Sequence, residues 1–133
     1  GLYLANKYYN LNKRIIGFAV CDNREYFVNH IDSINREALK YLDRGVDIKR
    51  EDIEINDNFT GVGYAISTKE ELEFIKYFAR KEAIALDPVY TGKAMYGLYS
   101  QIKTGSLKEA GNILFIHTGG LFGLFPKEGE FEF

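Results

Sequence analysis

The chain has 133 residues, which is enough for one domain with a hydrophobic core. Hydrophobic residues make up 46% of it, so a disordered segment is excluded. Its 17 basic and 19 acidic residues give a net charge of −2 without a basic stripe, which argues against binding to nucleic acid or to an anionic membrane.

The first half of the chain predicts two helices and two strands in alternation. Apolar residues at helical spacing indicate a short helix over 2–9, and the apolar run 14–21 indicates a buried parallel strand. A second amphipathic helix is predicted over 24–43. The alternating segment 52–56 indicates a strand with one wetter face, and the Asn-, Gly- and Thr-rich segment 56–68 predicts a loop.

The second half predicts two further helices and a strand. Ser67 and Glu70 have the spacing of a capping box, so a helix is predicted to begin near Thr68. Another helix is predicted over 91–105, where a glycine ends the apolar periodicity. The apolar run 112–120 is predicted to be a buried strand that ends in a Gly-Gly turn.

This order of elements predicts an α/β fold, with a mostly parallel sheet covered by helices on both faces. No internal repeat, linker or low-complexity segment divides the chain. We therefore expect residues 1–133 to form a single domain.

The sequence offers little sign of a metal site, a disulfide or a membrane span. Cys21 is the only cysteine, so no intrachain disulfide can form, which favours a reducing, cytoplasmic setting. His30 and His117 have no cysteine or carboxylate at ligand spacing, so no metal site is predicted. No apolar run approaches the length of a membrane span.

The segment Tyr90-Thr91-Gly92-Lys93 looks like the end of a phosphate-binding P-loop but fails its requirements. A P-loop needs a glycine five positions before its Gly-Lys and a Ser or Thr after the lysine; position 87 is Asp and position 94 is Ala. Thr91 still stands near the start of a predicted helix. It either caps that helix or faces a polar ligand group, and the residues alone leave both open.

Two segments can lie at the carboxyl ends of the predicted strands, where parallel α/β sheets bind ligands. One is the loop 61–64, which contains Tyr64, and the other is 117–120. Gly119 and Gly120 would let the backbone approach a ligand closely, or they form a plain left-handed turn. Thr118 could donate or accept a hydrogen bond there.

Three motifs carry a resemblance to a known family. DPVYTGKAMYGL (87–98), NILFIHTGGLFGLF (112–125) and the loop GVGYAIST (61–68) occur in the order and form found in the D-cysteine desulfhydrase and 1-aminocyclopropane-1-carboxylate deaminase family. These are fold-type II enzymes, similar to tryptophan synthase β, that depend on pyridoxal phosphate. The resemblance covers nearly the whole chain and is most specific from Gly61 to Leu124.

The resemblance implies roles for six residues. Tyr64 and Tyr90 are expected beside the cofactor and substrate as catalytic residues, where either phenol could assist proton transfer or the leaving group. Contacts to the cofactor are expected from a further set: Thr91, Thr118, Gly119 and Gly120. The loop departs slightly from the family pattern, with Ala65-Ile66-Ser67 where many relatives have Pro before the Ser or Thr.

Two essential parts of such an enzyme are not in this sequence. The family's cofactor-binding lysine and its Ser/Gly-rich phosphate loop lie in an earlier segment, and Lys93 belongs to a different motif. The resemblance therefore implies a carboxyl-terminal fragment of a larger enzyme. Alone, it is expected to be inactive and not to bind pyridoxal phosphate.

Thr91 and Thr118 decide the substrate that the resemblance implies. Ring-opening members have Glu after the DPVY tyrosine and Leu after the final His, whereas desulfhydrase-like members have small hydroxyl residues at both places. A neutral hydroxyl makes the cofactor ring a weaker electron sink, and elimination of a good leaving group needs only a modest one. The implied reaction converts D-cysteine to pyruvate, ammonia and hydrogen sulfide.

Other readings stay open. Within the family, the alternative is 1-aminocyclopropane-1-carboxylate deaminase activity, and outside enzymes it is a non-catalytic α/β module that binds a small ligand. The family's full-length members imply a homodimer that acts on a small amino-acid substrate.

Overall fold

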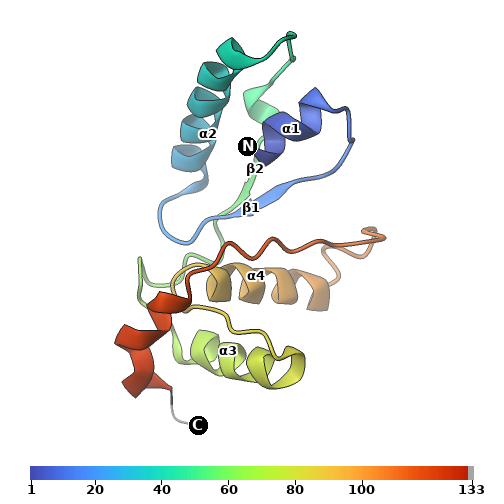
Figure 1. Ribbon diagram of the computed structural model, residues 1–133. Coiled ribbons are helices and arrows are strands. Elements are labelled where there is room, and N and C mark those ends of the chain that lie inside the picture. The colour runs from blue at the N-terminus through green and yellow to red at the C-terminus, as the bar shows by residue number, and fades with distance from the viewer. Residues whose placement is uncertain (132–133) are drawn as a thin grey trace.

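The computed structural model describes residues 1–131, and its helices and strands follow the predicted order as far as residue 103. They are α1 (Leu2–Tyr8), β1 (Ile16–Phe18), α2 (Arg24–Ala38), the 3₁₀ helices η1 (Leu39–Tyr41) and η2 (Arg50–Asp52), β2 (Glu54–Asn56), α3 (Lys69–Glu82), α4 (Thr91–Lys103) and the 3₁₀ helix η3 (Leu121–Glu130). Figure 1 shows α1 and α2 on one side of the strands and α4, backed by α3, on the other.

The sheet in residues 1–131 is a parallel pair. β1 and β2 are in register at Ile16 with Glu54 and at Phe18 with Asn56. Arg14, just before β1, donates from Nη2 and Nε to the two oxygens of the Glu54 carboxylate, at 2.5 and 2.9 Å. The predicted α/β class with helices on both sides of a parallel sheet is confirmed, although β1 is shorter than predicted and half-buried.

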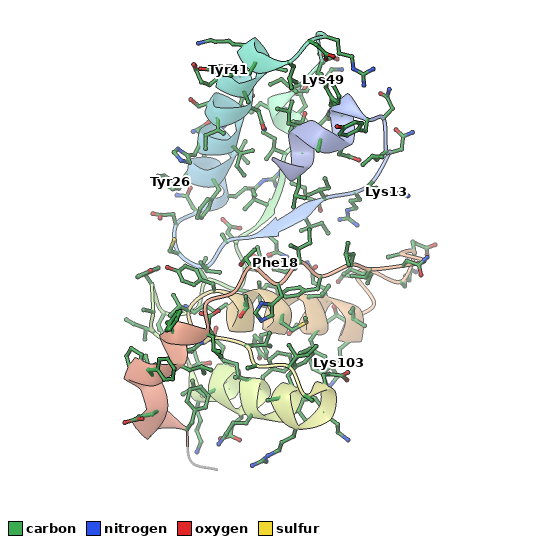
Figure 2. All side chains as sticks on the ribbon, viewed as in Figure 1. Lys13, Phe18, Tyr26, Tyr41, Lys49 and Lys103 are labelled. Carbon is green, nitrogen blue, oxygen red and sulfur yellow. The ribbon has the colours of Figure 1, made fainter. Side chains whose placement is uncertain are left out.

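Two hydrophobic clusters lie on opposite sides of the strands. The first joins α1, α2 and β2 and comprises Tyr3, Leu4, Ala19, Val28, Ile48, Ile53 and Ile55. The second joins α3 to the segment before α4 and to the carboxyl-terminal end, and comprises Leu72, Phe74, Ile75, Leu86 and Phe131. Phe18 lies between the strands and α4 (Figure 2), where a Cβ on Gly97 would come within 2.8 Å of its ring. The absence of a side chain at Gly97 therefore lets α4 approach β1.

The start of α3 is fixed by a capping box, one residue later than predicted. Thr68 is the N-cap: its hydroxyl accepts from Glu71 N at 3.2 Å, and the Glu71 carboxylate accepts from Thr68 N at 2.6 Å. Ser67, predicted to be the capping residue, instead donates to the carbonyl of Pro88 at 2.9 Å. The predicted helix start near Thr68 is therefore confirmed, and only the capping residue differs: Thr68 caps the helix, and Ser67 bonds Pro88.

The prediction of a buried strand over 112–120 is wrong. This segment is assigned no strand, and it pairs with neither β1 nor β2. Its apolar side chains are exposed: Leu114 to 85%, Ile116 to 48% and Ile113 to 45% of their surface. An apolar run becomes a buried strand only where a neighbouring strand takes its backbone hydrogen bonds, and residues 1–131 supply no such neighbour to it.

Candidate active site

The carboxylate of Asp87 organises the turn that leads into α4. It is 1% exposed; Oδ2 accepts from Val89 N at 2.8 Å and Tyr90 N at 2.7 Å, and Oδ1 accepts from Thr91 N at 2.8 Å. The Thr91 hydroxyl donates to Oδ1 at 2.7 Å and accepts from Asp87 N at 3.0 Å. Four donors thus satisfy one buried carboxylate and fix the direction in which Tyr90 leaves the turn.

Thr91 lies inside this turn. Its side chain is 2% exposed, and its hydroxyl uses its proton and one lone pair on Asp87. One lone pair is left over for any further partner. Its role at the helix start is thus visible, and its predicted contact with a cofactor stays a prediction.

The two predicted catalytic tyrosines meet. The phenol oxygens of Tyr64 and Tyr90 are hydrogen-bonded, and the rings lie edge to face with centroids 6.0 Å apart. Both side chains are partly open to solvent, at 57% and 43% exposure. The hydrogen bond with Tyr64 is the main cause that raises the pKa of Tyr90 above its ordinary value, so the Tyr90 phenol stays protonated at neutral pH.

Lys93, in the first turn of α4, connects the loop that carries Tyr64 to this helix. Its amine donates to the carbonyls of Thr60 and Gly63 at 2.7 Å each, and its side chain is 1% exposed. Burial lowers the pKa of the amine, and the nearby Glu71 carboxylate opposes that shift. The amine is therefore committed to loop carbonyls, which agrees with its exclusion from a covalent cofactor role.

The 117–120 turn is anchored to the segment before α4. Gly119 N donates to His117 Nδ1 at 3.1 Å, so Nε2 carries the imidazole proton and donates to the carbonyl of Ala85 at 2.9 Å. Gly119 and Gly120 both have left-handed backbone, with φ of +97° and +96°. A Cβ on Gly120 would lie 2.5 Å from Asp87 Oδ1, so the two motifs meet at this carboxylate.

Thr118 is placed differently from the other predicted contact residues. It is exposed, and its hydroxyl makes no hydrogen bond within residues 1–131. The structure thus joins Tyr64 to Tyr90 and Thr91 to Asp87, and it places Gly120 against Asp87. Thr118 lies exposed in the same turn as Gly120.

Sequence reasoning missed Asp87 and Lys93 as organisers of this site. Asp87 carried a signal, since Asp-Pro followed by Thr four positions after the Asp is the spacing of a side-chain-capped turn. Lys93 carried almost none. Its partners, Thr60 and Gly63, stand 33 and 30 residues earlier, so only the fold reveals the contact.

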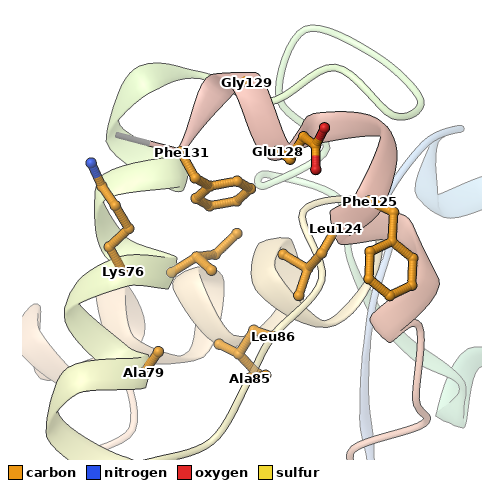
Figure 3. Close-up of a pocket in the computed structure, with 10 residues that line it drawn as sticks. Lys76, Ala79, Ala85, Leu86, Leu124, Phe125, Glu128, Gly129 and Phe131 are labelled. Carbon is orange, nitrogen blue, oxygen red and sulfur yellow. The ribbon is translucent and has the colours of Figure 1, made fainter. Parts of the chain in front are cut away.

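A separate apolar groove of about 610 Å³ lies between α3 and η3 (Figure 3). It is lined by Ile75, Lys76, Ala79, Ala85, Leu86, Leu124, Phe125, Glu128, Gly129 and Phe131. None of the predicted site residues lines it. The groove offers apolar contact area without the phenols and hydroxyls that the implied chemistry needs.

Comparison with known proteins gives relatives of one kind. No protein-family model matches the chain. Over 118 residues the chain is 44% identical to the mitochondrial bifunctional D-cysteine desulfhydrase/1-aminocyclopropane-1-carboxylate deaminase of Arabidopsis thaliana, covering 88% of this chain and 28% of the relative. It is 32% identical over 108 residues to a 1-aminocyclopropane-1-carboxylate deaminase of Ralstonia nicotianae, covering 81% of this chain and 32% of the relative.

A solved structure gives the same answer. The crystal structure of an ACC deaminase homologue superimposes with a TM-score of 0.84 at 35% sequence identity, over 97% of this chain and 38% of that one. The chain therefore spans roughly a third of the length of the relatives that it matches. No helix among residues 1–131 is long and apolar enough to cross a membrane. By these similarities the chain belongs to the D-cysteine desulfhydrase and 1-aminocyclopropane-1-carboxylate deaminase family, matching part of its members' length.

Proposed function

We propose that the chain is part of a pyridoxal-phosphate-dependent lyase that converts D-cysteine and one water to pyruvate, ammonia and hydrogen sulfide. The observation that carries this proposal is the neutral hydroxyl at position 91, which donates to Asp87 Oδ1. Ring-opening members of the family are expected to have Glu at this place, whereas Thr91 is neutral. Thr91 therefore matches the small hydroxyl residue of the desulfhydrase pattern.

The residues at this end of α4 fit one side of pyridoxal phosphate. Thr118 offers an exposed hydroxyl, and the phenols of Tyr64 and Tyr90 are partly open to solvent. The one carboxylate in the turn, Asp87, is saturated by four donors. When bound, the cofactor supplies an electron sink, and these neutral hydroxyls leave that sink modest.

The phosphate of the cofactor and its covalent lysine are not assigned to this chain. Lys93 is buried and donates to two carbonyls, so it is not available for either task. The family resemblance assigns both tasks to a different part of the intact enzyme. We therefore expect residues 1–133 alone to show neither cofactor binding nor turnover.

The phenol pair suits proton donation to a departing sulfur. In a bonded pair, one O–H donates to the other phenol oxygen, which leaves the second O–H free to donate outward. The hydrogen bond with Tyr64 raises the pKa of Tyr90, so the Tyr90 phenol is protonated at neutral pH and is available as a proton donor rather than as a base. A protonated thiol is a better leaving group than a thiolate formed in an apolar site.

The competing activity within the family is ring opening of 1-aminocyclopropane-1-carboxylate. It is favoured by the name of the Ralstonia relative and of the solved homologue, and the Arabidopsis relative carries both names. A non-catalytic binding module is the other alternative, and it would show a bound small ligand without turnover. As further parts of the proposal, we place the intact protein in a reducing compartment and expect a homodimer.

The proposal is tested in the intact protein by Thr118→Glu, which adds a carboxylate where we place the ring nitrogen. Sulfide release from D-cysteine is expected to fall by about tenfold or more, and the absorption spectrum of the cofactor is expected to change. Ser33→Glu, an exposed position on α2, is the matched control for added charge. Unchanged turnover together with an unchanged spectrum would remove Thr118 from the cofactor site.

A further inference from the structure

The buried amine of Lys93 has no part in the chemistry described above, yet it contacts the loop that carries Tyr64. We propose that Lys93 is a positioning residue for the proposed reaction: it holds the loop 60–67 against α4 so that the Tyr64 phenol meets the Tyr90 phenol. This inference rests on the proposed function for its catalytic meaning, but its geometry does not.

Two anchors bracket Tyr64, and both end on the segment that carries Tyr90. On one side, Lys93 Nζ donates to the carbonyl of Gly63, the residue directly before Tyr64. On the other side, Ser67 donates to the carbonyl of Pro88, two residues before Tyr90. Because the same short stretch of chain provides both anchors and the second tyrosine, it sets the distance between the two phenols.

The loop has little else to hold it. Tyr64 is 57% exposed, so packing does not fix its ring. The backbone at Gly61 and Ala65 is left-handed, with φ of +67° and +57°, a conformation that an alanine adopts only when its surroundings impose it. Inside the loop, Ile66 N donates to the Gly63 carbonyl at 3.3 Å, a single long hydrogen bond.

The surroundings of Lys93 are built for a buried cation. Its amine bonds two carbonyls, and the Glu71 carboxylate, which also caps α3, acts on it electrostatically. A Cβ on Gly61 would lie 3.3 Å from the amine and 3.2 Å from Glu71 Oε1, so the glycine leaves room for both charged groups. A buried charge is costly without such partners, which marks this contact as specific.

The test uses the intact protein and a double-mutant cycle between Lys93→Met and Tyr64→Phe. Each single change is expected to lower kcat for sulfide release by about tenfold or more, with KM for D-cysteine changed far less. The double variant is expected to be no slower than Tyr64→Phe alone, because Lys93 acts through Tyr64. Lys93→Arg keeps the donors and is expected to recover part of the loss.

Lys103→Met makes the same chemical change at the far, exposed end of α4 and is the matched control. It is expected to leave kcat unchanged. If Lys93→Met does not fold, Ser67→Ala removes the other anchor, and the same non-additivity with Tyr64→Phe is expected. Additive losses in either cycle would show a merely structural role and would overturn the inference.

A second measurement does not depend on turnover. In protein labelled at the tyrosine Cζ carbons, the NMR titration of Tyr90, assigned with Tyr90→Phe, reports the phenol contact. Lys93→Met is expected to move this titration to lower pH, because the hydrogen bond that raises the pKa of Tyr90 is lost. An unchanged titration would overturn the inference, whereas a wild-type protein that releases no sulfide but shows the expected shift would overturn only the proposed function.

Discussion

Two regions meet at Asp87, and they satisfy their polar groups in different ways. On the α4 side, the side chains of Asp87, Lys93 and Ser67 form hydrogen bonds of 2.7–2.9 Å with backbone groups. On the other side, the segment 112–120 is exposed along most of its length. The polar side chains of the first region find hydrogen-bond partners within the chain. The apolar side chains of the second region are not buried by residues 1–131.

The predicted site residues lie in both regions, and the two regions position them differently. The tyrosine pair is positioned by contacts inside this chain. Thr118, which the resemblance expects to contact the cofactor, lies on the exposed segment 112–120. We therefore infer that the phenol pair is preorganised here, and that the position of Thr118 depends on what packs on 112–120 in the intact protein.

The largest expected effect comes from a change at Asp87, whose carboxylate accepts four hydrogen bonds in the turn before α4. Asp87→Asn replaces one of the two acceptor oxygens, and with it the acceptor of two of the four hydrogen bonds, by an amide NH₂ that faces donors, so a loss of about 3 kcal/mol in the free energy of unfolding is expected. Denaturant unfolding measures it. Asp57→Asn, whose carboxylate accepts from Arg24 N at the surface, is the control, with an expected loss of about 1 kcal/mol or less. Equal losses would contradict the account of this turn.

The next effect tests the junction between the regions. Gly120→Ala places a Cβ 2.5 Å from Asp87 Oδ1 and also strains a left-handed backbone, so a loss of about 2–3 kcal/mol is expected. Gly119→Ala has nearly the same φ but open space around it, so only the strain of about 1 kcal/mol is expected. Thermal unfolding of the two variants separates the cost of the contact with Asp87 from the cost of the left-handed backbone. If Gly119→Ala costs as much, the contact with Asp87 is not what holds the turn.

A smaller effect concerns a strand that does have its partner. The Arg14 guanidinium lowers the pKa of the Glu54 carboxyl below its ordinary value of 4.5. The ion pair therefore stabilises the β1–β2 pair above that value, and the contribution is lost as the pH falls through the lowered pKa. Both side chains are partly exposed, so Arg14→Met is expected to cost less than about 1 kcal/mol at neutral pH.

Urea unfolding of wild type and Arg14→Met across this pH range checks the sign. The gap between the two proteins is expected to close towards acid pH. A gap that stays constant as the pH falls through the pKa of Glu54 would exclude this ion pair as its source.

The smallest effect is expected in the uncovered segment. Leu114→Ala removes a side chain that is 85% exposed, so the free energy of unfolding of residues 1–133 is expected to change by less than about 0.5 kcal/mol. Leu72→Ala, in the α3 cluster, is the buried control and is expected to cost about 2–5 kcal/mol. A large loss at Leu114 in residues 1–133 would show that the segment is packed after all.

The sequence predicted what local chemistry decides. The start of α3 near Thr68 follows from a hydroxyl three positions before a glutamate, and only the choice between Ser67 and Thr68 was missed, because either can cap while the other bonds elsewhere. The approach of Tyr64 to Tyr90 was implied by the resemblance rather than by spacing. The Lys93 contacts that hold it span 30 and 33 residues and follow from the fold alone.

The strand over 112–120 failed for a different reason. Its run of apolar residues predicts that the segment is buried, but it does not identify the neighbouring strand that would bury it. A periodicity argument has no access to a partner strand, so it assigned burial that residues 1–131 do not provide. The same reasoning worked for 52–56, because β1 lies beside it.

The most direct test of the central claim compares two substrates in the intact protein under the same conditions. Sulfide released from D-cysteine is measured beside ammonia released from 1-aminocyclopropane-1-carboxylate. The neutral hydroxyls at Thr91 and Thr118 predict that kcat/KM for sulfide release is the larger. A larger kcat/KM for the deamination would contradict the assignment of this chain to the desulfhydrase side of its family.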